Sequence, residues 1–91
     1  MPISTAQYSL DTTTPTLICS ADTQPAKVTV HNLESGVGKM VYLGNSGVTQ
    51  SNSLEVNPQV FFQFVLDPGD ALYAVANSVG NKVGVLIQKQ D

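Results

Sequence analysis

The side chains that could act as catalytic groups or metal ligands in this chain are few and lie far apart. His31 is the single histidine and Cys19 the single cysteine. A zinc site needs several nitrogen, sulfur or oxygen ligands at defined spacings, and neither residue has such neighbours. Polar and apolar residues alternate from Lys27 to Asn32, which places His31 on the outward side of a strand. We therefore expect no metal site and an exposed His31.

Two carboxylates, Asp67 and Asp70, flank the dipeptide Pro68-Gly69. Proline presets the first central position of a turn, glycine supplies the positive φ that follows, and an aspartate before them caps the local backbone. Calcium takes about six to eight oxygen ligands, and this segment offers two carboxylates. The sequence therefore predicts a tight turn here and neither a catalytic pair nor a cation site.

No other motif marks an active site. Gly36-Val37-Gly38 resembles part of a phosphate-binding loop but lacks the Gly-Lys-Ser/Thr ending and a following helix. The chain contains no Gly-x-Ser-x-Gly nucleophile motif. We predict no catalytic residue, no cofactor and no enzymatic activity. Tyr42 and Tyr73 could stack on a sugar if they shared an exposed face, although tyrosines of a β-sandwich are usually half-buried.

The charge balance excludes one class of partner. Four lysines, no arginine and seven acidic residues give a net charge of −3 and a pI near 4.7. Nucleic-acid binding requires clustered basic residues, and these lysines are scattered. Charged residues make up 12% of the chain, against about 25% in typical domains. This composition suits a surface that contacts other proteins, and it equally suits a neutral polar surface.

The length and cysteine content of the chain limit the number of domains and disulfides that it can have. A chain of 91 residues forms one domain. A single cysteine allows no internal disulfide, which favours folding in a reducing cytoplasm. We expect no signal peptide, because the first residues lack a basic and an apolar segment. No apolar run is long enough to cross a membrane, so we expect no membrane partner.

Short β-prone segments separated by turn residues predict an all-β fold. No stretch shows sustained helical periodicity, and the strand spacing is typical of a sandwich or barrel. We predict a small antiparallel β-sandwich, jelly-roll-like, with an OB-like barrel as second choice. The barrel would need a basic aromatic binding face, which is missing. The expected strands are residues 16–19, 27–32, 39–44, 54–56, 60–66, 71–76 and 82–88.

Three finer expectations concern how these segments are arranged. Residues 1–15 are polar and predict an extended N-terminal arm, in which Tyr8 and Leu10 could anchor a short strand, with the sandwich over residues 16–91. The run 60–66, with Phe62, Phe64 and Leu66 on one face, is apolar on both faces and predicts a central or covered strand. Residues 71–76 are expected to pair back with it, and Gly80-Asn81 to turn the chain into the last strand.

A resemblance to a known family rests on three segments. These are Met40 to Thr49, then Leu66-Asp67-Pro68-Gly69-Asp70-Ala71-Leu72-Tyr73-Ala74-Val75, and finally Val83 to Ile87. In this order they resemble small structural proteins of tailed bacteriophages, head decoration (cement) proteins and minor virion proteins with a β-sandwich domain. The resemblance spans roughly Val28 to Gln88 and carries no catalytic motif.

The resemblance implies a non-enzymatic virion protein, made in the host cytoplasm, that binds the major capsid protein and stabilises the assembled head. Such proteins typically form homotrimers, and their terminal arms lie on the capsid. A tail or fibre β-domain, or a small carbohydrate-binding module, remains an alternative. The residues expected to contact a partner are Tyr8, Leu10, Thr12, Tyr42 and Tyr73.

Overall fold

Eight strands and no helix make up the ordered secondary structure in the computed structural model, which describes residues 3–89 apart from the side chains of Phe64 and Lys89. The described residues therefore contain no helix that could span a membrane. The strands are β1 (Ile3–Ser9), β2 (Thr16–Cys19), β3 (Ala26–Asn32), β4 (Val41–Gly44), β5 (Leu54–Val56), β6 (Phe61–Leu66), β7 (Leu72–Ala76) and β8 (Lys82–Lys89).

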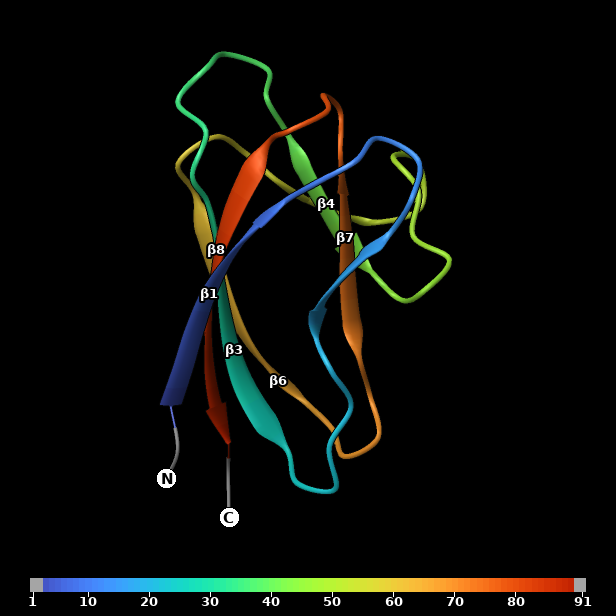
Figure 1. Ribbon diagram of the computed structural model, residues 1–91, viewed down its shortest axis with the longest axis vertical. Helices are drawn as coiled ribbons and strands as arrows, with labels where there is room; N and C mark the ends of the chain where they lie inside the picture. The colour runs from blue at the N-terminus through green and yellow to red at the C-terminus, as the bar shows by residue number, and fades with distance from the viewer. Residues whose placement is uncertain (1–2, 90–91) are drawn as a thin grey trace.

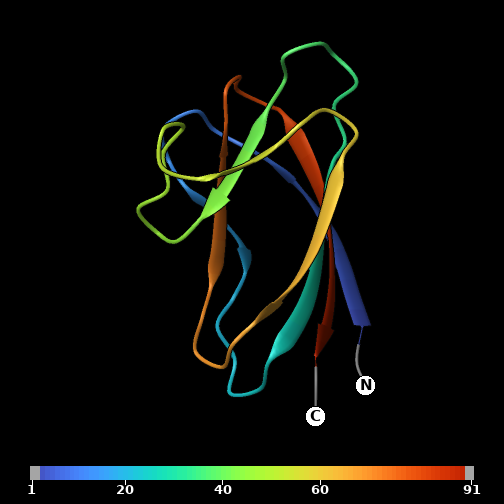
Figure 2. The same cartoon turned by 180° about the vertical axis from the view of Figure 1, so that it is seen from behind.

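These strands form two antiparallel four-stranded sheets that face one another (Figures 1 and 2). Sheet A has the order β1-β8-β3-β6, and sheet B has the order β2-β7-β4-β5. Most connections carry the chain from one sheet to the other, which is the arrangement of a double-sheet jelly roll. The predicted all-β antiparallel sandwich is confirmed, and the two separate sheets do not form the OB-like barrel held as second choice.

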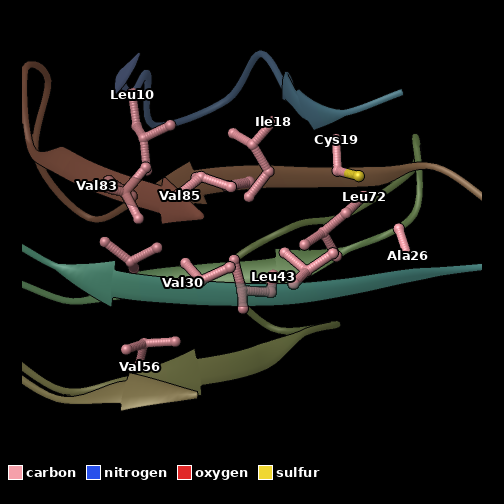
Figure 3. Packing of buried hydrophobic residues seen from close by; sticks show 14 residues of the cluster. Leu10, Ile18, Cys19, Ala26, Val30, Leu43, Val56, Leu72, Val83 and Val85 are labelled. Atoms are coloured by element: carbon pink, nitrogen blue, oxygen red, sulfur yellow. The ribbon is translucent and has the colours of Figure 1, made fainter. Parts of the chain in front are cut away.

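The main core fills the space between the sheets, where alternating residues of facing strands meet. In β3 the buried positions are Ala26, Val28, Val30 and Asn32, as the alternation of the sequence predicts. Figure 3 shows Val30 of sheet A beside Leu43 of sheet B in this layer. Val28 and Val30 are fully buried, and burying one such side chain stabilises the fold by about 1.5–3 kcal/mol.

The expected N-terminal arm is part of the sandwich. Residues Ile3–Ser9 pair along their whole length with β8, from Ile3 opposite Gln88 to Ser9 opposite Lys82. Leu10, directly after the strand, is 2% exposed and belongs to the main core. Met1 and Pro2 lie outside the described residues. An edge strand such as β1 exposes most of its side chains and can therefore be polar. For this reason its sequence is easily mistaken for an extended arm.

The two predicted hairpins around β7 are also wrong. β6 belongs to sheet A, whereas β7 pairs with β2 and β4 of sheet B, and β8 lies back in sheet A. The Pro68-Gly69 turn itself forms as predicted, because Gly69 has φ of 87° and the Asp70 amide donates to the Asp67 carbonyl at 3.1 Å. Turn chemistry reverses the chain, but it does not decide which sheet receives the next strand.

The turn before β8 differs in register from the prediction. The Asn81 amide donates to the Ser78 carbonyl at 3.3 Å, and Gly80 has φ of 88°. Gly80 is therefore the third residue of the turn, where a type II turn needs glycine. Asn81, expected at the centre of the turn, is buried instead.

Candidate protein-binding face

A broad face of sheet A points away from the core and is the candidate functional surface. β3 and β6 contribute three residues each and β1 and β8 four each, and the strand registers align them in rows across the sheet. We call this surface the outer face. Its residues are Ile3, Thr5, Gln7, Ser9, Lys27, Thr29, His31, Phe61, Gln63, Val65, Lys82, Gly84, Leu86 and Gln88.

The outer face carries little charge and much apolar surface. Lys27 and Lys82 are its two lysines, and no carboxylate lies on it, although the chain has seven acidic residues. Phe61 is 65% exposed and Val65 59% exposed, and Ile3 and Leu86 are exposed as well. The polar side chains of β3, Lys27, Thr29 and His31, lie between the apolar residues of β6 and those of β8 and β1. A partner that covers this face would therefore bury apolar surface without having to match many charges.

The middle of the outer face is hollowed over Gly84. Gly84 in β8 has no side chain of its own between Gln7 on β1 and His31 on β3, its neighbours across the sheet, and Leu33 packs at the edge of this space. The resulting shallow depression has a volume of about 320 Å³ and is lined on this face by Thr5, Gln7, Thr29, His31, Gly84 and Leu86. Its wall combines neutral polar groups with one apolar side chain, so it suits an uncharged side chain of a partner protein.

Two contacts between β3 and β6 order the outer face. The rings of His31 and Phe61 meet edge to face, with centroids 6.2 Å apart and planes at 90°. Gln63 Nε2 donates a hydrogen bond to Thr29 Oγ1 at 3.1 Å. Both pairs are direct cross-strand neighbours. His31 thus takes the outward position that the sequence predicts, half-buried beside Phe61.

The predicted central position of residues 60–66 is wrong, because β6 is an edge strand of sheet A. Phe62 and Leu66 point towards the core, whereas Phe61 and Val65 point to the outer face and remain exposed. The side chain of Phe64 lies outside the described residues. Sequence reasoning missed Phe61 and Val65 as surface residues. The signal for them was that both faces of this strand are apolar, although only one face can pack on the core.

A second, smaller apolar cluster covers the outside of sheet B. Tyr42, Val48 and Val75 are buried in it, with Met40 and Tyr73 packed against them. The loop of residues 45–53 folds back over β4 and β7. Gln50 Nε2 in this loop donates a hydrogen bond to the Ala76 carbonyl at 3.2 Å. Tyr42 is only 8% exposed, so the two tyrosines do not form an exposed platform for a sugar.

The residues expected to contact a partner take other places. The domain itself buries Leu10 and Tyr42, so neither side chain is available to a partner. Tyr8 and Tyr73 are half-buried against the two apolar clusters, and the Thr12 carbonyl accepts a hydrogen bond from Gln50 Nε2 at 3.4 Å. The structure does not bring these five residues together on one face. A partner role for Tyr8, Thr12 and Tyr73 stays a prediction.

The remaining side chains that the sequence analysis considered as metal ligands or catalytic groups lie in turns and connections. Within residues 3–89, no three histidine, cysteine, aspartate or glutamate side chains lie together as metal ligands. Asp67 and Asp70 are exposed at the ends of their turn. Gly36 and Gly38 lie in the connection between β3 and β4, where the Lys39 amide donates to the Gly36 carbonyl at 3.2 Å.

Three asparagines, of which Asn32 and Asn81 are buried, hold the loops at one end of the sandwich through hydrogen bonds. Asn32 is fully buried, and its Nδ2 donates to the carbonyls of Lys39 at 2.9 Å and Val56 at 3.0 Å. Asn77 Oδ1 accepts from the Met40 amide at 2.9 Å, and Asn81 Nδ2 donates to Asn77 Oδ1 at 3.3 Å. Since buried polar groups must be paired, these side chains are structural.

Comparison with known proteins gives a likeness of fold. No family model and no curated protein matches the chain. Among solved structures, it is similar to a chain described under the heading "Bacillus endospore appendages form a novel family of disulfide-linked pili". The TM-score is 0.61 at 10% identity, over 99% of this chain and 87% of that one. At this identity the match concerns the fold alone. The single cysteine of the present chain, Cys19, is buried in the core.

Proposed function

We propose that this chain is a non-enzymatic structural protein that binds a large protein assembly through the outer face of sheet A. The observation that carries the proposal is the composition of that face, where two lysines and no carboxylate stand among fourteen residues from the four strands. Interface cores are depleted in charged residues and enriched in aromatic ones, and Phe61 is exposed on this face.

The assembly we propose is the head shell of a tailed bacteriophage, with the major capsid protein as the partner. Support comes from the resemblance of residues 28–88 to head decoration proteins. The fold likeness to a pilus chain bears on architecture only and adds nothing on function. Copies that are joined in an oligomer would bind the shell together, so that each copy needs only a modest interface.

Co-sedimentation with particles tests the proposed face. Purified chain is mixed with heads of the encoding phage that lack it, and the bound fraction is measured after centrifugation. Leu86→Glu introduces a charge on the outer face beside the hollow, and we expect occupancy to fall at least several-fold. The matched control is Val79→Glu, at a residue 78% exposed in the turn before β8. Equal binding by both variants and the unchanged chain would refute the proposed face.

A tail or fibre location is the second candidate, because the same face could join a tail protein. The number of copies in a particle separates the two locations. A decoration protein covers the shell and approaches the abundance of the major capsid protein, whereas a tail component occurs in few copies.

A further inference from the structure

The four sheet edges of the sandwich differ in how well they are protected against pairing with another strand. In sheet B, β2 has four residues and a register shift between Leu17 and Cys19, and β5 has three residues with Glu55 at its centre. Short, irregular or charged edges resist the addition of a strand. In sheet A, β1 has seven residues and β6 has six, without a charge, a proline or a register shift.

The backbone of β6 has an open side. The Asn32 amide donates to the Val60 carbonyl at 3.0 Å, so in the alternating antiparallel pattern Phe62 and Leu66 also bond to β3. Phe61, Gln63 and Val65 therefore direct their N–H and C=O groups away from β3. Among the described residues, no turn or loop forms a backbone hydrogen bond to these three.

We propose that a second copy of this chain pairs with β6 in the antiparallel sense, about a two-fold axis at Gln63. In this register Gln63 lies opposite its own copy, and Phe61 lies opposite Val65 of the other copy. All three outward-directed residues then exchange backbone hydrogen bonds across the axis. A shift by two residues in either direction leaves one of them without a partner. The pairing joins two four-stranded sheets into one continuous sheet.

Side chains and charge favour a second copy as the occupant. On the outer face the pairing places the exposed ring of Phe61 beside the exposed Val65 of the other copy, an aromatic and β-branched cross-strand pair. Residues 59–66 contain no charged side chain, and Asp67 lies opposite Gln59 in this register. Two chains of net charge −3 can therefore meet here without opposing carboxylates. The inference does not rest on the phage assignment, and it differs from the homotrimer that the resemblance implies.

The edge strand β1 is the competing attachment site for β6. That pairing would leave a free β1 and a free β6 at the two ends of every assembly, so it would continue into open chains. β1 also exposes one large apolar side chain, Ile3, where β6 exposes Phe61, Phe62 and Val65. The two modes differ in outcome, since the two-fold mode stops at a dimer and the other grows with concentration.

Sedimentation equilibrium over a micromolar to millimolar concentration range tests the two-fold pairing. We expect a species of two 9.6-kDa chains. Gln63→Pro removes an N–H that faces away from β3, and proline is tolerated at such an edge position. The matched control, Gln63→Thr, also loses the side-chain bond to Thr29 but keeps the edge N–H. We expect Gln63→Pro to be monomeric, with the circular dichroism of the unchanged chain, and Gln63→Thr to remain dimeric.

A charge provides a second variant that does not alter the backbone. Val65→Lys places a lysine in each copy beside the Phe61 ring of the other, and we expect the dissociation constant to rise at least tenfold. Val37→Lys makes the same change in net charge at a fully exposed loop residue away from β6. This control should leave the dissociation constant of the dimer unaltered. A monomer throughout, a trimer, open-ended growth, or a dimer that survives both Gln63→Pro and Val65→Lys would overturn the proposal.

Discussion

Gly44 leaves the space that Val48 occupies. A β-carbon at Gly44 would lie 2.8 Å from Cγ2 and 3.0 Å from Cβ of Val48, closer than such atoms approach in proteins. This relationship lets the loop of residues 45–53 fold onto β4 and bury Val48 with Tyr42 and Val75. The second apolar cluster thus depends on one residue without a side chain.

Gly44→Ala should therefore destabilise the domain. Overpacking of this kind costs about 1–3 kcal/mol, which thermal unfolding followed by circular dichroism can measure. Gly47→Ala in the same loop is the matched control, because a β-carbon there would meet only Asn45 Oδ1, at 3.4 Å. In the double variant Gly44→Ala/Val48→Ala the contact with Cγ2 is removed and only the 3.0 Å approach to Cβ of residue 48 remains, so the two losses should be less than additive. Strict additivity would contradict the account of this contact.

Leu10→Ala should show that the N-terminal segment belongs to the core. A buried leucine truncated to alanine costs about 2–5 kcal/mol, and Leu10 is 2% exposed. Leu17→Ala, at a leucine 43% exposed on β2, should cost clearly less.

By the same reasoning, deletion of residues 1–14 should unfold the domain, since it also removes β1, the strand that pairs with β8. A truncated chain with an unchanged melting temperature would restore the view of a detachable arm.

Asn32→Ala should be among the most damaging substitutions of a polar residue. Besides its two donated bonds, Asn32 Oδ1 accepts from the Glu34 amide at 3.0 Å, so truncation releases three backbone groups. A buried group left without a partner costs about 1–3 kcal/mol, and the loss in free energy of unfolding should reach or exceed the top of that range. Asn57→Ala, at an exposed asparagine, is the control. Similar urea midpoints for the two variants would contradict the structural role.

Gly84→Ala should separate stability from binding. A β-carbon at Gly84 would meet Leu33 at 3.5 Å, which is ordinary contact, so the fold can accept it. Replacing a strand glycine by alanine should stabilise the domain by about 0.5–1 kcal/mol. The same methyl group narrows the hollow of the outer face, so binding to the proposed shell should weaken. If binding strengthened together with stability, or did not change, the result would contradict the hollow as a contact point.

Local patterns predicted the strands well and their partners poorly. The alternation around Val28 and Val30 fixes which side of β3 is buried, because that depends on neighbours in sequence. The sheet that receives β7 depends on long-range packing, which no turn residue encodes. Asn32 illustrates the limit for the interior, since a polar residue at a core position becomes understandable only when its carbonyl partners from residues 39 and 56 are known.

The candidate face was less predictable than the fold. The sequence directed attention to Tyr42, which the domain buries, and the strand order was needed to show that Phe61 and Val65 remain exposed. Gly84 is an ordinary strand glycine in the sequence, and only its neighbours Gln7 and His31 on adjacent strands reveal the hollow. Surface features of a sandwich arise from register between distant segments, so single-sequence patterns do not contain them.

The proposed function is tested most directly by the copy number of this polypeptide in gradient-purified particles of the phage to which the proposal assigns it. Quantitative mass spectrometry against the major capsid protein gives the ratio. An abundance close to that of the major capsid protein is the result that the account predicts. A few copies per particle would move the chain to the tail, and its absence from purified particles would contradict a virion role altogether.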